Sequence, residues 1–333
     1  MRWSSLPHRR QVAIARRIIR ERRTIWLRRY PGLITVGFGV QHTKRSRLTD
    51  SPPGILFLVA EKRNQPPGRT IPPKVRALLS RQSRSTVSIP TDVLEVKGLK
   101  FHNPTFASFD SSGNVLVAGN ACCALSETPG SPAQYVLGCH HVFLASENNP
   151  GMAPGPVAYV ACRGVPIGPV PPNCQGTMNP GNPPVAFSND AALALILAGG
   201  RPNLDNFWRT NWYPAGIEGD SRNVPNQSSS YAVYTDRGPL AARYVGHFGS
   251  YPIAVNGGLS IIVPEVFLYD AYCIPGDSGS PFYDVKTGIA LGMHFAGAQS
   301  ADTGSGYLCM AEPLWRLTSS RGPFGRNLFY ARV

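Results

Sequence analysis

Long apolar runs are absent from this sequence of 333 residues. No uncharged apolar stretch reaches about 18 residues, so we expect no transmembrane helix. Arginines interrupt the apolar positions near the N-terminus and no small-residue cleavage site follows them, which argues against a secretory signal. We therefore expect a cytoplasmic protein.

Cysteine patterns typical of metal sites and disulfide frameworks are also missing. The seven cysteines include no CxxC pair and no Cys/His group with zinc spacing, so we predict no metal site and no cofactor. Their odd number favours free thiols in a reducing compartment, with occasional disulfides as the alternative.

Acidic residues are scarce: 19 Asp/Glu stand against 33 Lys/Arg, which gives a net charge of +14. The imbalance lies in residues 1–100, which hold 22 Lys/Arg against 5 Asp/Glu, whereas residues 101–333 hold 11 against 14. Such a basic region predicts binding to an acidic partner protein, to nucleic acid or to an anionic membrane. It also indicates a domain boundary near residue 100.

Residues 8–30 have the periodicity of an amphipathic helix. Apolar residues recur three to four positions apart, and nine arginines lie between them. Pro31-Gly32 predicts the end of the helix. We expect either a helix docked on its own protein with a solvated arginine face, or a helix that binds a partner, a membrane or nucleic acid.

The next segment, up to residue 100, predicts a small α/β module. β-Branched apolar runs predict strands at 33–40, 54–61 and 87–96. The segment 71–80 is entered through two prolines and predicts a short helix.

From residue 101 onward the sequence predicts short strands separated by turns. The chain has 32 prolines and 34 glycines, which suit many turns, and a hydrophobic content of 42%, which suits an ordinary core. The Pro-rich segment 166–184 predicts a long loop. Strand-like runs occur at 115–118, 135–137, 157–161, 191–197, 232–235, 259–263, 266–269, 288–296 and 306–311.

One turn in this region, residues 273–281, carries residues suited to nucleophilic catalysis. A serine hydroxyl is a weak nucleophile near neutral pH, so it needs a base and donors for the oxyanion that its attack creates. Gly276 permits a backbone that points its own amide and that of Ser278 at one spot, and Gly279 leaves room for a substrate backbone. Asp277 is expected to be buried and paired with a polar or positive group. The alternative is a plain Gly/Ser-rich hairpin turn.

The hexapeptide Gly-Asp-Ser-Gly-Ser-Pro at 276–281 resembles the nucleophile loop of the chymotrypsin/trypsin-like serine peptidases. That family has the chain order His, Asp, Ser, which implies His141 as base, Asp190 as acid and Ser278 as nucleophile. His141 directly precedes a Val-Phe step, as the base does in bacterial members, and His140 is the alternative. The competing aspartates are Asp205, Asp220 and Asp236.

The resemblance also implies the oxyanion donors and the substrate pocket. The amides of Gly276 and Ser278 would receive the oxyanion. The strand 288–297 looks like the family strand that pairs with the substrate backbone and lines the specificity pocket. The pocket candidates are Tyr272, His294, Phe295 and Gly297.

Two of these candidates bear on specificity. Tyr272 stands where trypsin has an aspartate, which implies cleavage that is not tryptic. His294 matches in position the histidine by which glutamyl endopeptidases and picornavirus-type proteases hold Glu or Gln side chains. A buried histidine satisfied by a backbone carbonyl is the alternative.

For the whole chain, the resemblance implies a mainly β protein: a chymotrypsin-like double β-barrel preceded by a basic helix and a small α/β module. The expected units are a basic amphipathic helix at 1–30, a regulatory module at 31–100 and a trypsin-like peptidase domain of two six-stranded barrels at 101–333. The expected function is a regulated serine endopeptidase of a bacterial branch, acting on a dedicated partner protein in a stress or defence system. The alternatives are a catalytically idle binding module, and a binder of anionic partners through the basic third.

Overall fold

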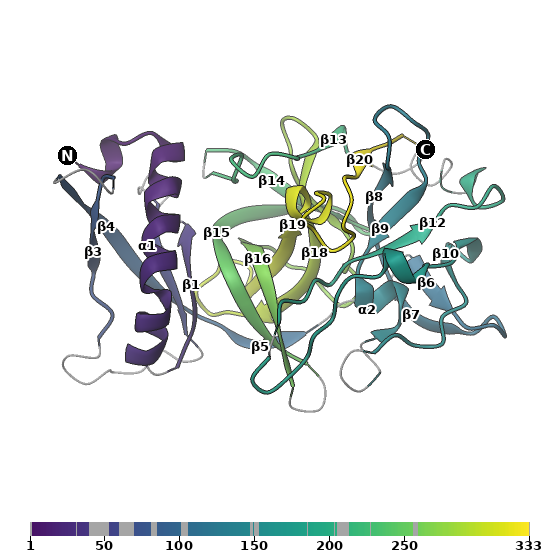
Figure 1. Ribbon diagram of the computed structural model, residues 1–333, viewed down its shortest axis with the longest axis horizontal. Coiled ribbons are helices and arrows are strands. Elements are labelled where there is room, and N and C mark those ends of the chain that lie inside the picture. The colour runs from purple at the N-terminus through teal and green to yellow at the C-terminus, as the bar shows by residue number, and fades with distance from the viewer. Residues whose placement is uncertain are drawn as a thin grey trace.

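The computed structural model describes residues 2–30, 32–39, 53–59, 70–80, 85–100 (97–100 by backbone alone), 106–146, 149, 153–184, 186–202, 204, 213–226, 228–255 and 259–332. Strands dominate these residues, which confirms the mainly β prediction. Figure 1 shows the N-terminal helix and its strands at one end of the molecule, a barrel in the middle and a second group of strands at the other end. No helix in the described ranges combines the length and apolar character that a membrane span requires.

The N-terminal group consists of η1 (Trp3–Ser5), α1 (His8–Arg29), β1 (Leu33–Gly39), β2 (Gly54–Val59), β3 (Lys74–Leu78) and β4 (Thr86–Glu95). Helix α1 has the predicted extent and buries its apolar stripe, which includes Val12 and Ile18, against this sheet. Near its end, the Trp26 ring packs edge-on against Phe57 with 5.2 Å between the ring centroids. The arginine face is therefore carried by a helix docked on its own protein.

The helix predicted at 71–80 was wrong, because this segment contains strand β3. β3 pairs antiparallel with β4 and alternates between exposed and buried residues, with Val75 and Ala77 facing the core. Lys-Val-Arg-Ala-Leu suits a helix by local propensity, but an edge of the sheet was available to pair with. Tertiary pairing therefore overrode propensity at this position.

The central barrel is closed by six antiparallel strands in the order β14-β17-β18-β19-β16-β15, with β14 and β15 paired to complete the circle. Its strands are β14 (Tyr231–Thr235), β15 (Gly238–Ala254), β16 (Ser260–Asp270), β17 (Pro281–Asp284), β18 (Ile289–Gln299) and β19 (Tyr307–Pro313). Two short strands, β5 (Lys97–Lys100) and β13 (Gly216–Ile217), also pair with β18. This is the predicted second barrel, and the turn with Ser278 connects β16 to β17.

Two features of this barrel differ from the predicted strand list. β15 was not predicted at all, and the runs at 259–263 and 266–269 are one continuous strand, β16, that passes through Pro264. β15 pairs with β16 on one side and with β14 and β1 on the other. Its three glycines and Arg243 hide the apolar alternation from which a strand is predicted.

The N-terminal group and the central barrel share one sheet and one core. β1 pairs antiparallel with β15, with Phe38 opposite His247. A single cluster of buried apolar residues includes Val12 and Ile18 of α1 together with Phe282 of β17 and Cys273, which begins the turn that carries Ser278. The α1 side of the molecule and the start of that turn therefore belong to one continuous apolar core.

The remaining strands form the first barrel of the peptidase region, as two four-stranded sheets, β11-β10-β6-β7 and β12-β9-β8-β20. Their elements are β6 (Phe106–Phe109), β7 (Val115–Gly119), β8 (Ala121–Ser126), β9 (Tyr135–Gly138), α2 (His140–Phe143), β10 (Tyr159–Cys162), β11 (Val165–Gly168), η4 (Pro172–Cys174), β12 (Ala192–Leu195) and β20 (Phe329–Tyr330). The short helix α4 (Leu314–Leu317) follows β19 and packs against β18 and β19 of the central barrel. Leu195 N donates to Pro169 O (2.8 Å) and Leu197 N to Ile167 O (3.0 Å), which joins the two sheets between β11 and β12. Among the described residues these sheets hold eight strands, two more than the six predicted, and one of the eight is the C-terminal β20, which pairs with β8.

Candidate active site

The turn between β16 and β17 holds Ser278 in a compact conformation. Gly276 has φ +114° and Gly279 has φ +97°, backbone conformations that residues with a Cβ rarely adopt. Asp277 N donates to Ile274 O (3.1 Å), and Ser280 N donates to Asp277 O (3.0 Å). The Ser278 side chain is buried, and its hydroxyl donates to the carbonyl oxygen of Phe295 at 3.3 Å.

The carboxylate of Asp277 is buried beneath this turn and paired, as predicted. It accepts hydrogen bonds from the Ile274 amide (2.7 Å) and from the Arg237 guanidinium (2.6 Å). Burial raises the pKa of Asp277, while the Ile274 amide and Arg237 oppose that rise. Arg237 lies in the turn between β14 and β15, so two loops of the central barrel are tied together. The sequence offered no signal for Arg237.

A second anchor, Asn120, comes from the first barrel and was also missed by the sequence analysis. Its side-chain amide donates to Gly276 O (3.2 Å) and to Ser280 Oγ (2.9 Å), and its backbone amide donates to Ser278 O (2.5 Å). The Gly276 amide itself has no hydrogen-bond acceptor among the described residues. A lone asparagine between two strands carries no motif that would have identified it.

The predicted base and acid lie together. His141, in the short helix α2, places Nδ1 2.5 Å from Asp190 Oδ2, and its backbone amide donates to Asp190 Oδ1 at 2.9 Å. Both side chains are fully buried. The neighbouring His140 instead contacts Ser146 Oγ at 2.8 Å, and burial lowers the pKa of His140 to about 4, so it is neutral at physiological pH.

Two of the competing aspartates lie elsewhere. Asp220 is paired with Arg222 at 2.7 Å on the surface. Asp236 lies beside Asp277, and burial and that neighbouring charge raise its pKa to about 6. Asp205 falls outside the described residues. Among the candidate acids whose positions the structure describes, Asp190 is therefore the one that contacts His141.

The histidine turn and the serine turn meet across Gly119, the last residue of β7. A Cβ at Gly119 would lie 2.6 Å from a methyl group of Val142 and 2.9 Å from Ser278 O. The two turns also share a partner on β18, because the Cys139 thiol donates to His294 O (3.4 Å) and the Gly279 amide donates to the same oxygen (2.7 Å). The first barrel thus brings the His141–Asp190 pair against the turn of Ser278.

The pocket candidates separate into buried and exposed residues. His294 is fully buried, with Nδ1 2.5 Å from the Tyr269 hydroxyl and 3.1 Å from Met310 O. Phe295 is buried and contacts Ser278 through its carbonyl oxygen. Tyr272 is 53% exposed and packs edge-on against a neighbouring tyrosine ring. Gly297 lies on β18 and pairs with the backbone of β5.

One group of side chains near the site has the donor types of a metal site. One ligand atom each of Cys139, His141 and Asp190 lies within 4.8 Å of the others. The 2.5 Å between Nδ1 and Oδ2 is short for two ligands of one tetrahedral ion, whose bonds of about 2.0–2.2 Å hold their ends more than about 3 Å apart. The short distance therefore suits a proton shared between His141 and Asp190 better than a metal ion bound by both. All seven cysteines are buried and free.

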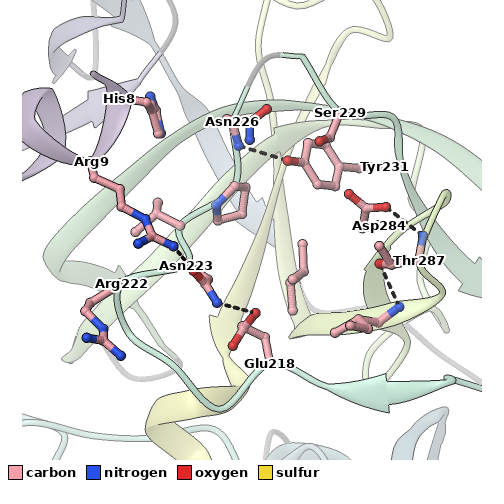
Figure 2. Close-up of a pocket in the computed structure, with 14 residues that line it drawn as sticks. His8, Arg9, Glu218, Arg222, Asn223, Asn226, Ser229, Tyr231, Asp284 and Thr287 are labelled. Carbon is pink, nitrogen blue, oxygen red and sulfur yellow. Dashed lines mark hydrogen bonds between the residues drawn. The ribbon is translucent and has the colours of Figure 1, made fainter. Parts of the chain in front are cut away.

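A separate cavity of about 380 Å³ lies between the start of α1 and the central barrel. Figure 2 shows His8 and Arg9 on one wall, and Glu218, Tyr231 and Asp284 on the others. Its lining includes none of the predicted site residues. Cations and carboxylates are mixed around it, so its chemistry does not single out one class of ligand.

The closed barrel, the strand groups on either side of Ser278 and the chain order His141, Asp190, Ser278 give the chain the predicted chymotrypsin-like fold. No protein-family model and no curated protein sequence matches the chain. Among solved structures, the Rv3671c protease of M. tuberculosis in its active form aligns over 67% of this chain and 80% of its own, at 16% identity and a TM-score of 0.38. A chymotrypsin of Cellulomonas bogoriensis aligns over 70% and 98%, at 13% identity and a TM-score of 0.36. Because these identities and TM-scores are low, the fold is assigned from the order and pairing of the strands in this chain and not from the alignments.

Proposed function

We propose that the chain is a serine endopeptidase, and the buried His141–Asp190 pair set against the turn of Ser278 carries this proposal. His141 takes the proton of Ser278 as the hydroxyl attacks a peptide carbonyl, and Asp190 holds the imidazole and stabilises its positive form. The amides of Gly276 and Ser278 receive the oxyanion, and water later hydrolyses the acyl-enzyme.

The arrangement of Gly276 supports its role as an oxyanion donor. Its carbonyl is held by the Asn120 side chain, which fixes the plane of the following peptide, and its own amide is left without an acceptor among the described residues. A donor fixed in advance stabilises a developing negative charge without reorganisation.

A fluorophosphonate probe tests this function directly, because it reacts with an activated serine and not with ordinary ones. We expect the full chain to be labelled, and Ser278→Ala and His141→Ala to remain unlabelled. Lys286→Ala, in the turn between β17 and β18, is the matched control and should be labelled like the wild type. A wild type that resists the probe while it remains folded would favour the idle binding module.

For specificity, we propose a preference for Glu, Gln or a medium apolar side chain and against Lys or Arg. Tyr272 brings no negative charge, and an unpaired cation in a pocket costs several kcal/mol, roughly 3–5. His294 Nδ1 lies 2.5 Å from the Tyr269 hydroxyl and 3.1 Å from the carbonyl oxygen of Met310. In the tautomer in which the Tyr269 hydroxyl donates to Nδ1, the proton is on Nε2, which then donates to a side-chain carbonyl. In the other tautomer, Nδ1 donates to Met310 O and the histidine is satisfied by a backbone carbonyl. A peptide library read by mass spectrometry would contradict this by showing cleavage chiefly after Lys or Arg.

The regulation of the peptidase is proposed to involve β5. β19 occupies one edge of β18, so β17 and β5 share the other edge. β17 pairs up to Met293, and β5 pairs antiparallel from Gly297 to Gln299. Glu95, two residues before β5, is held beside the end of β18. Its carbonyl oxygen accepts a hydrogen bond from the Ser300 hydroxyl (2.8 Å), and its amide donates to the Asp302 carboxylate (2.7 Å).

The edge filled by β5 lies beside the nucleophile. The carbonyl of Phe295, two residues from Gly297 along β18, contacts the Ser278 hydroxyl. An extended peptide that adds to an exposed sheet edge is a general mode of peptide binding, so a substrate paired along this edge would run toward Ser278. β5 therefore restrains the peptidase by occupying the place of a substrate backbone.

Proline substitution tests this restraint in the full chain. Consecutive residues of a strand point their amides to opposite sides, so replacing both Gly98 and Leu99 by proline removes at least one amide that faces β18. We expect faster turnover of a short neutral peptide and faster probe labelling, whereas the matched Gly98→Ala/Leu99→Ala variant keeps the amides and stays slow. Equal rates in both variants would refute the restraint.

A further inference from the structure

One buried carboxyl beside the candidate site has no part in the mechanism above. Glu312, on β19, is fully buried, and its Oε1 accepts a hydrogen bond of 2.6 Å from the backbone amide of Asp190. Its other oxygen, Oε2, has no hydrogen-bond partner among the described residues. A buried carboxylate in such a place would be costly, whereas a neutral carboxylic acid is tolerated.

This contact crosses from one barrel to the other. Asp190 lies just before β12 of the first barrel, and Glu312 belongs to the second. Four residues after Glu312, Arg316 donates to the Asn189 side chain at 3.2 Å. The second barrel therefore holds two consecutive residues, 189 and 190, of the segment that presents the carboxylate to His141.

We propose that Glu312 is a positioning residue, a neutral acid that holds the Asp190 backbone from the second barrel without adding a charge to the His141–Asp190 pair. The inference rests on the proposed function, because it assigns Glu312 a role through that pair. Asp190 uses both carboxylate oxygens on His141, at 2.9 Å to the backbone amide and 2.5 Å to Nδ1. A displacement of its backbone would therefore move the imidazole as well.

The charged groups around Glu312 are consistent with its neutral form. Burial and the negative charge of Asp190 raise the pKa of Glu312 to about 8, and the Asp190 amide and Arg316 oppose this only in part. On β18 the residue opposite Glu312 is the apolar Met293, which offers no compensating charge. Above this pH a second carboxylate would form next to Asp190.

The test combines two variants with two measurements on the full chain. Glu312→Gln keeps an acceptor for the Asp190 amide but cannot ionise, whereas Glu312→Leu keeps the volume and removes the acceptor. We expect Glu312→Leu to slow fluorophosphonate labelling of Ser278 about tenfold or more, as expected for one lost buried hydrogen bond, and Glu312→Gln to restore most of the rate.

The second measurement is an NMR titration of the His141 ring, which does not depend on turnover. In the wild type the His141 ring resonances should report the ionisation of Glu312 by an inflection near pH 8, and Glu312→Gln should abolish that inflection. Identical titration curves would overturn the proposal, as would a Glu312→Gln variant labelled as slowly as Glu312→Leu. If Glu312→Leu does not fold, the glutamine variant and the NMR titration still decide. Failure of the peptidase proposal would appear separately, as a wild type that the probe does not label.

Discussion

Replacing Trp26 by alanine tests whether residues 1–100 are part of the catalytic fold or a separable module. Trp26 is 6% exposed and packs edge-on against Phe57 of β2, and both belong to the cluster that also contains Phe282 and Cys273 beside the nucleophile turn. Deleting a buried Trp side chain costs about 3–5 kcal/mol of unfolding free energy. That is a large share of the roughly 5–15 kcal/mol that stabilise a typical domain.

The adjacent Ile25 supplies the matched control. Its side chain is 60% exposed, so Ile25→Ala should change stability by no more than about 0.5 kcal/mol. Urea unfolding would be followed by far-UV circular dichroism and by the loss of probe labelling at Ser278. If the α1 side and the central barrel form one cooperative unit, both signals shift together to lower urea in Trp26→Ala. Labelling that survives beyond the transition of the α1 side would refute this reasoning and make residues 1–100 an independent module.

Three further predictions follow from individual contacts. Asn120→Ala should lower kcat/KM by about tenfold or more at unchanged fold, as steady-state kinetics would show, because it removes the side-chain hydrogen bonds to Gly276 O and Ser280 Oγ that hold the turn carrying the oxyanion donors. His140 has a folded pKa of about 4, below its unfolded value of 6.5, so protons bind the unfolded chain more readily between these pH values. The free energy of unfolding should therefore fall by up to roughly 3 kcal/mol as the pH is lowered from 6.5 toward 4. In urea titrations, His140→Gln should flatten this dependence. The exposed arginines of α1 should bind a single-stranded oligonucleotide in a salt-sensitive manner that Arg20→Glu with Arg28→Glu abolishes, and no binding at low salt would contradict this.

The sequence by itself determined the elements with strong local signals. The 3.6-residue periodicity and the terminal Pro31-Gly32 placed α1 correctly, because its buried stripe is continuous in the sequence. The turn around Ser278 could be located from its glycines, since their left-handed conformations are required at those positions. The burial and pairing of Asp277 followed from the same turn. The segment containing β3 failed, because its residues suit a helix and a strand about equally.

Only the tertiary structure decided which distant groups meet. Asn120, Arg237 and Glu312 each stand alone in the sequence, and each acquires a role only because another strand or turn brings an amide or a carboxylate within hydrogen-bond distance. The joining of β1 to β15 likewise depends on backbone pairing across more than two hundred residues, about which side-chain periodicity carries no information. Local pattern specifies a segment's conformation, whereas partners are selected by the shared burial of surfaces far apart in the chain.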